Sequence, residues 1–309
     1  MKAKAKEVTP QELAGIIRRH PRVVALTGAG ISVESGIPDF RSASGLWSRF
    51  DPMEYANIRA FRRNPAKVWA MLKEMDAVIT RARPNPAHYA LAALEARGFL
   101  TGIITQNVDN LHREAGNETV FELHGNLFRL RCMSCETKQN LTREAMFEMA
   151  HAALAEIPEF SLAAFAQAFP RCECGGLTRL DFVSFGESVQ CLTEAKSAAE
   201  ACDVMLIVGT SGLVYPAAAL PGIAKSGGAR LIEINWKESE LTSACHLSIR
   251  AQAADHAPPG EPQGLLAAQQ AQPAQAGGPH PLRRVRHPQQ VRHRLRAGLR
   301  REVPQPAVR

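Results

Sequence analysis

The chain of 309 residues is long enough for two domains, or for one large domain with an appendage. Hydrophobic residues make up 45% and charged residues 22%, as in ordinary globular proteins, and no run of about 18 apolar residues occurs, which excludes a membrane-spanning helix. Residues 1–7 are Lys-rich but lack the apolar stretch of a signal peptide, so we expect a cytoplasmic protein with no membrane partner.

The formal net charge of +7 comes almost entirely from residues 251–309, which contain nine Arg, no Lys and three acidic residues. Residues 1–250 are nearly neutral, so we expect no nucleic-acid binding by this part; only the basic tail could bind nucleic acid. The tail has nine Pro and nine Gln but no Phe, Trp, Tyr or Ile. It cannot bury enough apolar area to offset the entropy of ordering, and we predict that it is disordered.

The first predicted element is a helix that ends at His20 and begins with a capping box from Thr9 to Glu12, with Pro10 in its first turn. Buried runs then predict strands at 22–26, 102–105, 120–123, 127–131, 204–208 and 230–234. Helical spacing predicts helices at 60–81, 86–97, 142–169 (broken at Pro158), 189–201 and 216–225. Strands that alternate with helices predict an α/β fold with a parallel sheet covered on both faces.

This alternation stops after residue 130 and resumes near residue 180. We therefore predict a discontinuous Rossmann-like domain at 1–130 and 180–250, interrupted by a small zinc-binding domain at 131–179. Residues 251–309 form the basic tail.

Cysteine spacing supports the zinc prediction. The chain has seven Cys, an odd number without a secretory signal, so a disulfide framework is a poor interpretation. Four of them form two close pairs, Cys132 with Cys135 and Cys172 with Cys174. Four thiolates fill the coordination sphere of a tetrahedral zinc ion, which predicts one structural zinc rather than a catalytic one. The remaining three, Cys191, Cys202 and Cys245, are predicted to be small core residues.

A glycine-rich loop, Gly28-Ala29-Gly30-Ile31-Ser32, follows the first buried strand. Its bare backbone N–H groups could approach a pyrophosphate, although a tight strand-to-helix turn would account for the glycines equally. Val33 stands where the usual dinucleotide-binding motif has a third Gly. The loop continues to Asp39-Phe40-Arg41, where Arg could pair with a phosphate and Phe could cover a planar ring; the alternative is a solvated ion pair beside a core Phe.

Polar residues also follow the later strands. Gln106-Asn107-Val108-Asp109 comes directly after a strand, where amides can bind ribose hydroxyls or a carboxamide, or can cap a helix. His124, followed by Gly125, closes the next strand and is a candidate general base, whereas His88 and His112 lie on predicted helices and are assigned as surface or hydrogen-bonded residues. Gly209-Thr210-Ser211 and Asn235 end the last two strands and suit a phosphate or ribose contact.

Taken together and in this order, these motifs make residues 13–249 resemble the sirtuins, the family of NAD-dependent protein lysine deacylases. The resemblance implies NAD as cosubstrate and catalytic roles for His124 and Asn107. It also implies NAD contacts for the following residues: Gly28, Ala29, Gly30, Ile31, Asp39, Phe40, Arg41, Gln106, Asn107, Val108, Asp109, Gly209, Thr210, Ser211, Asn235, Trp236, Lys237 and Ala253. Acylated-lysine proteins or peptides would be the substrates, with Phe185–Glu187 and Gly212–Val214 as edges for an extended peptide.

The substrate is expected to be a neutral acyl group, acetyl first. Sirtuins that remove succinyl groups carry a Tyr and an Arg where this chain has Leu72 and Met75, and neither residue can pair with a carboxylate. Two alternatives remain open. One is an NAD-dependent protein mono-ADP-ribosyltransferase, and the other is a zinc-containing module that binds NAD or nucleic acid without catalysis.

Overall fold

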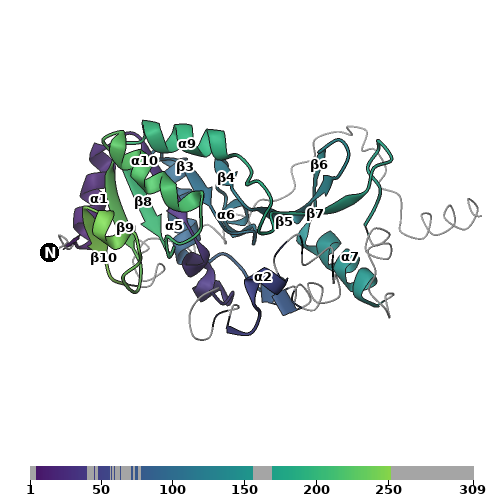
Figure 1. Cartoon of the computed structure of the whole chain (residues 1–309). Coiled ribbons are helices and arrows are strands. Elements are labelled where there is room, and N and C mark those ends of the chain that lie inside the picture. Colours follow the sequence, from purple (N-terminus) through teal and green to yellow (C-terminus); the bar gives the residue numbers. More distant parts are fainter. Residues whose placement is uncertain are drawn as a thin grey trace, which may run out of the picture. The chain divides into compact units, whose positions relative to one another are not determined.

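The computed structural model describes residues 5–39, 45, 48–55, 57, 59, 63, 71, 74–75, 78–155 and 169–251 (Figure 1). All of them belong to one unit that spans Met1–Pro262. The predicted tail beyond residue 251, most of the helix predicted at 60–81 and the second half of the one predicted at 142–169 lie outside the described residues. No helix in the described ranges is long and apolar enough to cross a membrane.

A seven-stranded parallel sheet forms the larger layer, in the order β1-β10-β9-β8-β2-β3-β4. The strands are β1 (Lys6–Glu7), β2 (Val23–Thr27), β3 (Leu100–Thr105), β4 (Val120–Glu122), β8 (Val204–Val208), β9 (Arg230–Ile234) and β10 (Leu247–Ile249). The predicted Rossmann-like parallel sheet is therefore confirmed. Sequence analysis missed β1 and β10, because strands of two and three residues carry no readable pattern and are held by pairing with each other and with β9.

Both faces of this sheet are covered. On one face, α1 (Pro10–Arg19) and α5 (Pro86–Ala96) share a core with Val23 and Ala25 of β2; on the other, α9 (Leu192–Ala201) and α10 (Leu220–Ser226) pack on Val24 and Leu26. Because both sets of alternate side chains are buried, β2 reads as a continuous apolar run. The predicted capping box at Thr9 is present. The single helix predicted at 216–225 is instead a 3₁₀ turn, η3 (Ala217–Ala219), followed by α10.

A second sheet of three antiparallel strands follows β4, in the order β6-β5-β7. It consists of β5 (Gly125–Cys132), β6 (Lys138–Asn140) and β7 (Thr178–Phe182), with the helix α7 (Arg143–Ala155) after β6. The strand β5 begins at Gly125, so the small sheet starts before the predicted boundary at residue 131. The remaining elements are short: η1 (Ala29–Ser35), α2 (Pro52–Tyr55), α6 (Leu111–Glu114) and η4 (Thr242–Ala244).

Candidate active site

A cleft of about 1140 Å³ opens at the carboxyl ends of β2, β3, β8 and β9, the edge where open parallel sheets bind ligands. Most of the predicted NAD-contacting residues line it: Gly28, Ala29, Gly30, Asp39, Gln106, Asn107, Val108, Asp109, Gly209, Thr210, Ser211, Asn235, Trp236 and Lys237, together with His124. Phe40, Arg41 and Ala253 lie outside the described residues.

Ile31 is placed differently from the prediction. Its side chain is fully buried in the core shared by α1 and α5, and it does not line the cleft. Its carbonyl accepts a hydrogen bond from the Asn85 side chain at 2.7 Å, and its N–H donates to the carbonyl of Gly28 at 3.1 Å. Ile31 therefore anchors the glycine loop to the core instead of facing a ligand.

The glycines of the first loop pack it against the second loop. The N–H of Gly30 donates to the carbonyl of Gly209 at 2.8 Å, and the N–H of Gly28 donates to the carbonyl of Val208 at 3.1 Å. A Cβ on Gly30 would lie 2.7 Å from the Cα of Gly209, closer than any side chain can approach. The expectation that the N–H groups of Gly28 and Gly30 are bare is thus wrong, because loop packing already uses them.

His124 lies two residues after the end of β4, and hydrogen bonds of both its backbone carbonyl and its ring hold it in place. Its Nδ1 lies 2.9 Å from the carbonyl of Gln106; a carbonyl only accepts, so Nδ1 carries the proton and Nε2 of the neutral ring is the basic nitrogen. Burial lowers the pKa of His124, and this hydrogen bond opposes part of that shift. The lowered pKa favours a neutral ring near pH 7. Gly125 is required next to it, since its φ is +79° and a Cβ would lie 2.0 Å from the carbonyl oxygen of Asp181.

Three polar side chains interlock on the floor of the cleft. The hydroxyl of Ser32 donates to Asp109 Oδ2 at 2.7 Å, and the amide of Asn107 donates to Ser32 Oγ at 3.1 Å and to the carbonyl of Gly28 at 3.2 Å. Burial raises the pKa of Asp109, while hydrogen bonds from Ser32 and the N–H of Leu111 oppose that rise. Ser32 was not among the predicted site residues, although it ends the glycine motif and lines the cleft.

Thr210 links the loops that follow β3, β8 and β9. Its hydroxyl accepts from the amide of Gln106 at 2.9 Å, and its carbonyl accepts from the amide of Asn235 at 3.1 Å. The adjacent Trp236 leaves 57% of its surface exposed, and the ammonium of Lys237 lies 4.7 Å from the centre of the indole. The predicted second half of the nucleotide site therefore forms one continuous wall.

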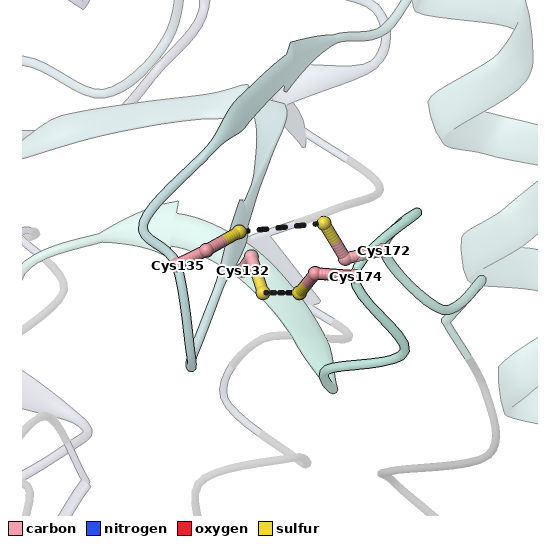
Figure 2. A group of neighbouring side chains, drawn as sticks. All are labelled: Cys132, Cys135, Cys172 and Cys174. Atoms are coloured by element: carbon pink, nitrogen blue, oxygen red, sulfur yellow. Dashed lines mark hydrogen bonds between the residues drawn. The ribbon is translucent and has the colours of Figure 1, made fainter.

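The four predicted zinc ligands come together (Figure 2). The sulfur atoms of Cys132 and Cys174, and those of Cys135 and Cys172, are each 3.6 Å apart, and all four lie within 4.8 Å of one another. Zinc–sulfur bonds of about 2.3 Å in a tetrahedron place the sulfurs about 3.8 Å apart, so the cluster fits a zinc ion. None of the four lines the cleft, and four thiolates leave no coordination position for water or substrate, which makes the site structural.

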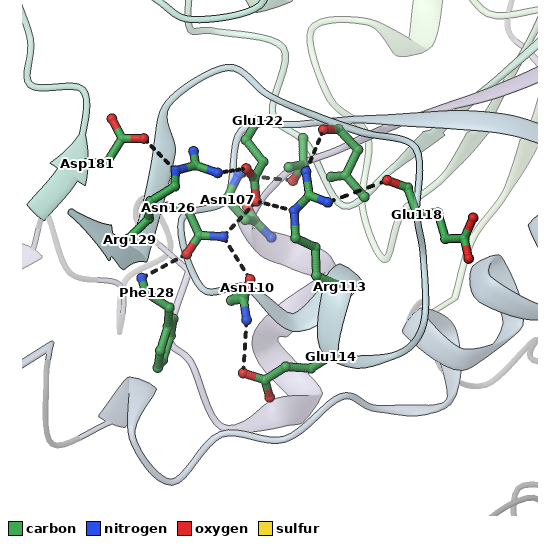
Figure 3. Close-up of polar contacts among 12 residues, drawn as sticks. Asn107, Asn110, Arg113, Glu114, Glu118, Glu122, Asn126, Phe128, Arg129 and Asp181 are labelled. Carbon is green, nitrogen blue, oxygen red and sulfur yellow. Dashed lines mark hydrogen bonds and ion pairs between the residues drawn. The ribbon is translucent and has the colours of Figure 1, made fainter. Parts of the chain in front are cut away.

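A buried ion-pair network that the sequence did not predict joins the two sheets (Figure 3). The guanidinium of Arg129 on β5 donates to Asp181 on β7 at 2.7 Å and to Glu122 on β4 at 2.8 Å. Glu122 also accepts from Arg113 and from Asn126. Burial alone would raise the pKa of Asp181, but hydrogen bonds from Arg129 and from a glutamine lower it below its ordinary value. Because Glu122 precedes His124 and Asn126 follows it, the network fixes the backbone on both sides of His124.

Replacing Arg129 with methionine is expected to reduce the free energy of unfolding by about 3–5 kcal/mol, because two buried carboxylates would lose their shared cation. Denaturant titration measures this change. A matched control is Arg22→Met, which removes an exposed ion pair with Asp203 and should cost much less stability, because water and salt screen exposed charges. Equal losses for the two variants would contradict a structural role for the buried network.

Comparison with known proteins agrees with this geometry. The profile of the Sir2 family matches residues 28–216. An NAD-dependent protein deacylase from Desulfosudis oleivorans is 44% identical over 243 residues, covering 77% of this chain and 89% of the relative. The structure of a Sir2 homologue with NAD is 39% identical with a TM-score of 0.69, covering 82% of this chain and 93% of that one. The structure of a Sir2 variant with a deacetylated peptide and 3'-O-acetyl-ADP-ribose is 31% identical with a TM-score of 0.68. The match covers 81% of this chain and 96% of that one. The chain therefore belongs to the Sir2 family.

Proposed function

We propose that this protein removes acyl groups, acetyl first, from lysine side chains of proteins, with NAD as cosubstrate and with nicotinamide, O-acyl-ADP-ribose and free lysine as products. The observation that carries the proposal is that His124, with Nδ1 anchored to Gln106 and Nε2 left as its basic nitrogen, lines the same cleft as both glycine loops. The similarity to NAD-dependent deacylases over most of the chain supports the same activity.

The cleft suits a dinucleotide in size and lining. Its volume of about 1140 Å³ is at the upper end for ligand pockets, enough for an extended cofactor and a side chain together. The buried polar residues Asn107, Asp109, Thr210 and Asn235 lie at the carboxyl ends of neighbouring strands. Bound NAD supplies an activated ribose carbon with nicotinamide as leaving group.

Each wall of the cleft has a role in this proposal. Asp109, held by Ser32, accepts a hydrogen bond from the carboxamide of nicotinamide. Asn107 and Gln106, with Asp39, Phe40 and Arg41, orient the nicotinamide ribose and the phosphates. The adenosine side is bound by Gly209, Thr210, Ser211, Asn235, Trp236 and Lys237, and by Ala253.

His124 acts as the general base. Its unprotonated Nε2 takes a proton from a ribose hydroxyl, which can then attack the acyl carbon. The burial that lowers the pKa of His124 keeps the ring neutral and able to accept that proton near pH 7. Gln106 fixes the ring plane through Nδ1, so the accepting nitrogen does not depend on a rotamer change.

The other parts of the chain have supporting roles. We propose that Cys132, Cys135, Cys172 and Cys174 hold one zinc ion that stabilises an inserted module. We further propose that this module takes in the whole small sheet, from Gly125 to Phe182, and not only residues 131–179, so that it interrupts the sequence of the NAD-binding domain. Acylated proteins are the partners, and we place the protein in the cytoplasm, where such substrates and NAD occur together.

One assay tests the function and separates it from its alternatives. Nicotinamide release is measured with NAD and an acetyl-lysine peptide, and the second product is identified as O-acetyl-ADP-ribose or as an ADP-ribosylated protein. Deacylation requires O-acetyl-ADP-ribose in equal amount with nicotinamide. Labelled protein without that product would identify a mono-ADP-ribosyltransferase, and the absence of nicotinamide release would identify a module that binds without catalysis.

Acetyl-lysine peptides are expected to be deacylated at least tenfold faster than succinyl-lysine peptides, measured as kcat/KM. The apolar end of the cleft is lined by Ile37, Met71, Met75, Ile79 and Phe182, and none of these can pair with the carboxylate of a succinyl group. Met75→Arg is the informative variant, since it supplies a cation and should narrow the ratio. A wild-type preference for succinyl peptides would overturn the assignment to neutral acyl groups.

A further inference from the structure

Two buried imidazoles lie behind the cleft without lining it. His88 on α5 is fully buried, His112 on α6 is 3% exposed, and their ring centres are 4.9 Å apart. Burial lowers the pKa of His88 to about 4, and burial together with repulsion from His88 lowers the pKa of His112 well below its usual value. Both rings are therefore neutral at physiological pH, and hydrogen bonds decide which nitrogen of each carries the proton.

The tautomer of His88 follows from its neighbour in the chain. The backbone N–H of Asn85 points to Nδ1 of His88 at 3.3 Å. A backbone N–H can only donate, so Nδ1 holds a lone pair and Nε2 carries the hydrogen. Among the described residues, this buried Nε2 has no hydrogen-bond partner. His88 therefore presents an unsatisfied donor.

His112 presents the opposite requirement. Its Nε2 lies 2.9 Å from the hydroxyl of Thr27, and that hydroxyl lies 2.9 Å from the hydroxyl of Thr105, to which it can donate. With Thr27 donating to Thr105, Nε2 of His112 is the donor to Thr27 and Nδ1 holds a lone pair. Nδ1 also has no partner among the residues that the structure describes. The reverse tautomer would bury two unsatisfied N–H groups on neighbouring rings, which is costly.

Each ring is connected to a different wall of the cleft. From His112, the path runs through Thr27 to Thr105, whose hydroxyl accepts from the backbone N–H of Asn107 at 3.1 Å. From His88, it runs through Asn85, whose amide donates to the carbonyl of Ile31 and to the hydroxyl of Ser35 at 3.0 Å. Ile31 and Ser35 both belong to η1, the 3₁₀ turn that begins within the glycine loop.

We propose that His88 and His112 form a pair of neutral rings in contact, both as Nε2–H tautomers, and that this pair positions Asn107 and η1 relative to each other for NAD binding. The inference rests on the proposed function in so far as the cleft takes NAD. Both histidines are positioning residues, because each acts through Thr27 or Asn85 and neither reaches the cleft.

Three variants test the connection to the cleft. His112→Leu removes the hydrogen bond to Thr27 at similar volume, His112→Gln restores a donor to Thr27, and Thr27→Val removes the linking hydroxyl. We expect His112→Leu and Thr27→Val to raise KM for NAD and Kd for ADP-ribose about three- to tenfold, the range of one hydrogen bond. His112→Gln should recover most of the loss, and the double variant should be no worse than His112→Leu alone.

The matched control is Thr101→Val. Thr101 lies on β3, as Thr105 does, but its hydroxyl donates to the carbonyl of Val23 at 2.9 Å and does not line the cleft. It should lower Tm without changing KM for NAD. If His112→Leu and Thr27→Val lower Tm in the same way and leave both KM and Kd within twofold of wild type, the two histidines only stabilise the fold and the proposal is overturned.

Nitrogen NMR of wild-type protein labelled in histidine tests the pair without NAD or activity. The proposal requires both rings to be Nε2–H tautomers at pH 7, each with an unprotonated Nδ1. The signals of each ring are assigned by their loss in His88→Gln or in His112→Gln. An Nδ1–H tautomer or a charged ring at either position would refute the pair. A wild-type protein that shows these tautomers but binds neither NAD nor ADP-ribose would instead refute the proposed function.

Discussion

His124→Ala is expected to reduce nicotinamide-coupled deacetylation by about a hundred- to ten-thousandfold, while Kd for NAD stays within a few-fold of wild type. A positioned general base contributes a factor of this size, and alanine offers no group that can take the proton. Binding should persist because the loops that form the cleft are held by other contacts, such as the Gly30 to Gly209 and Asn107 to Gly28 hydrogen bonds. Steady-state kinetics and calorimetry measure the two quantities.

The chain offers a matched control in His20. Its Nδ1 lies 2.8 Å from the carbonyl of Ile16 at the end of α1, so it makes the same kind of ring-to-carbonyl contact as His124, but it does not line the cleft. His20→Ala should leave kcat unchanged. If His124→Ala keeps more than a tenth of wild-type kcat, another group performs the proton transfer and the assignment of His124 fails.

The parts of the fold that were predictable are those whose signal is local in the sequence. The buried runs at β2, β8 and β9, the capping box at Thr9 and the position of His124 after β4 are each visible within a few residues. The cysteine cluster was also predictable, since two close pairs of thiols supply the four soft ligands that a tetrahedral zinc ion needs, even with 36 residues between the pairs.

What escaped prediction depends on contacts between distant segments. No local pattern in the sequence connects Arg129, Glu122 and Asp181; Arg129 meets both carboxylates only because β5 pairs with β7 and follows β4 in the chain. Gly28 and Gly30 fit a phosphate loop in the sequence, but only the structure shows that their N–H groups donate to the carbonyls of Val208 and Gly209. For the same reason Ile31 was assigned to the cleft, because no local pattern separates a loop residue that faces a ligand from one that faces the core.

Loss of the zinc ion is expected to unfold the small sheet and, with it, to abolish activity. The Cys132 and Cys135 pair ends β5, and the Cys172 and Cys174 pair precedes β7, so the metal ties together strands whose shared core is small. Gly176 shows how tightly the loop closes, since a Cβ there would lie 2.8 Å from the sulfur of Cys132. Binding of a structural zinc ion contributes about 10–16 kcal/mol, more than the stability of most domains.

Activity should follow stability because the small sheet also holds the catalytic loop. The carbonyl of His124 accepts from the N–H of Val183, directly after β7, at 2.8 Å. Cys172→Ser should therefore lose about one equivalent of zinc by elemental analysis, lower Tm by more than 10 °C and reduce kcat at least a hundredfold. The exposed Cys191, which lies outside the cluster, provides the control Cys191→Ser, with unchanged metal content and Tm. A Cys172→Ser protein with wild-type Tm would show that the four thiolates do not hold a structural metal.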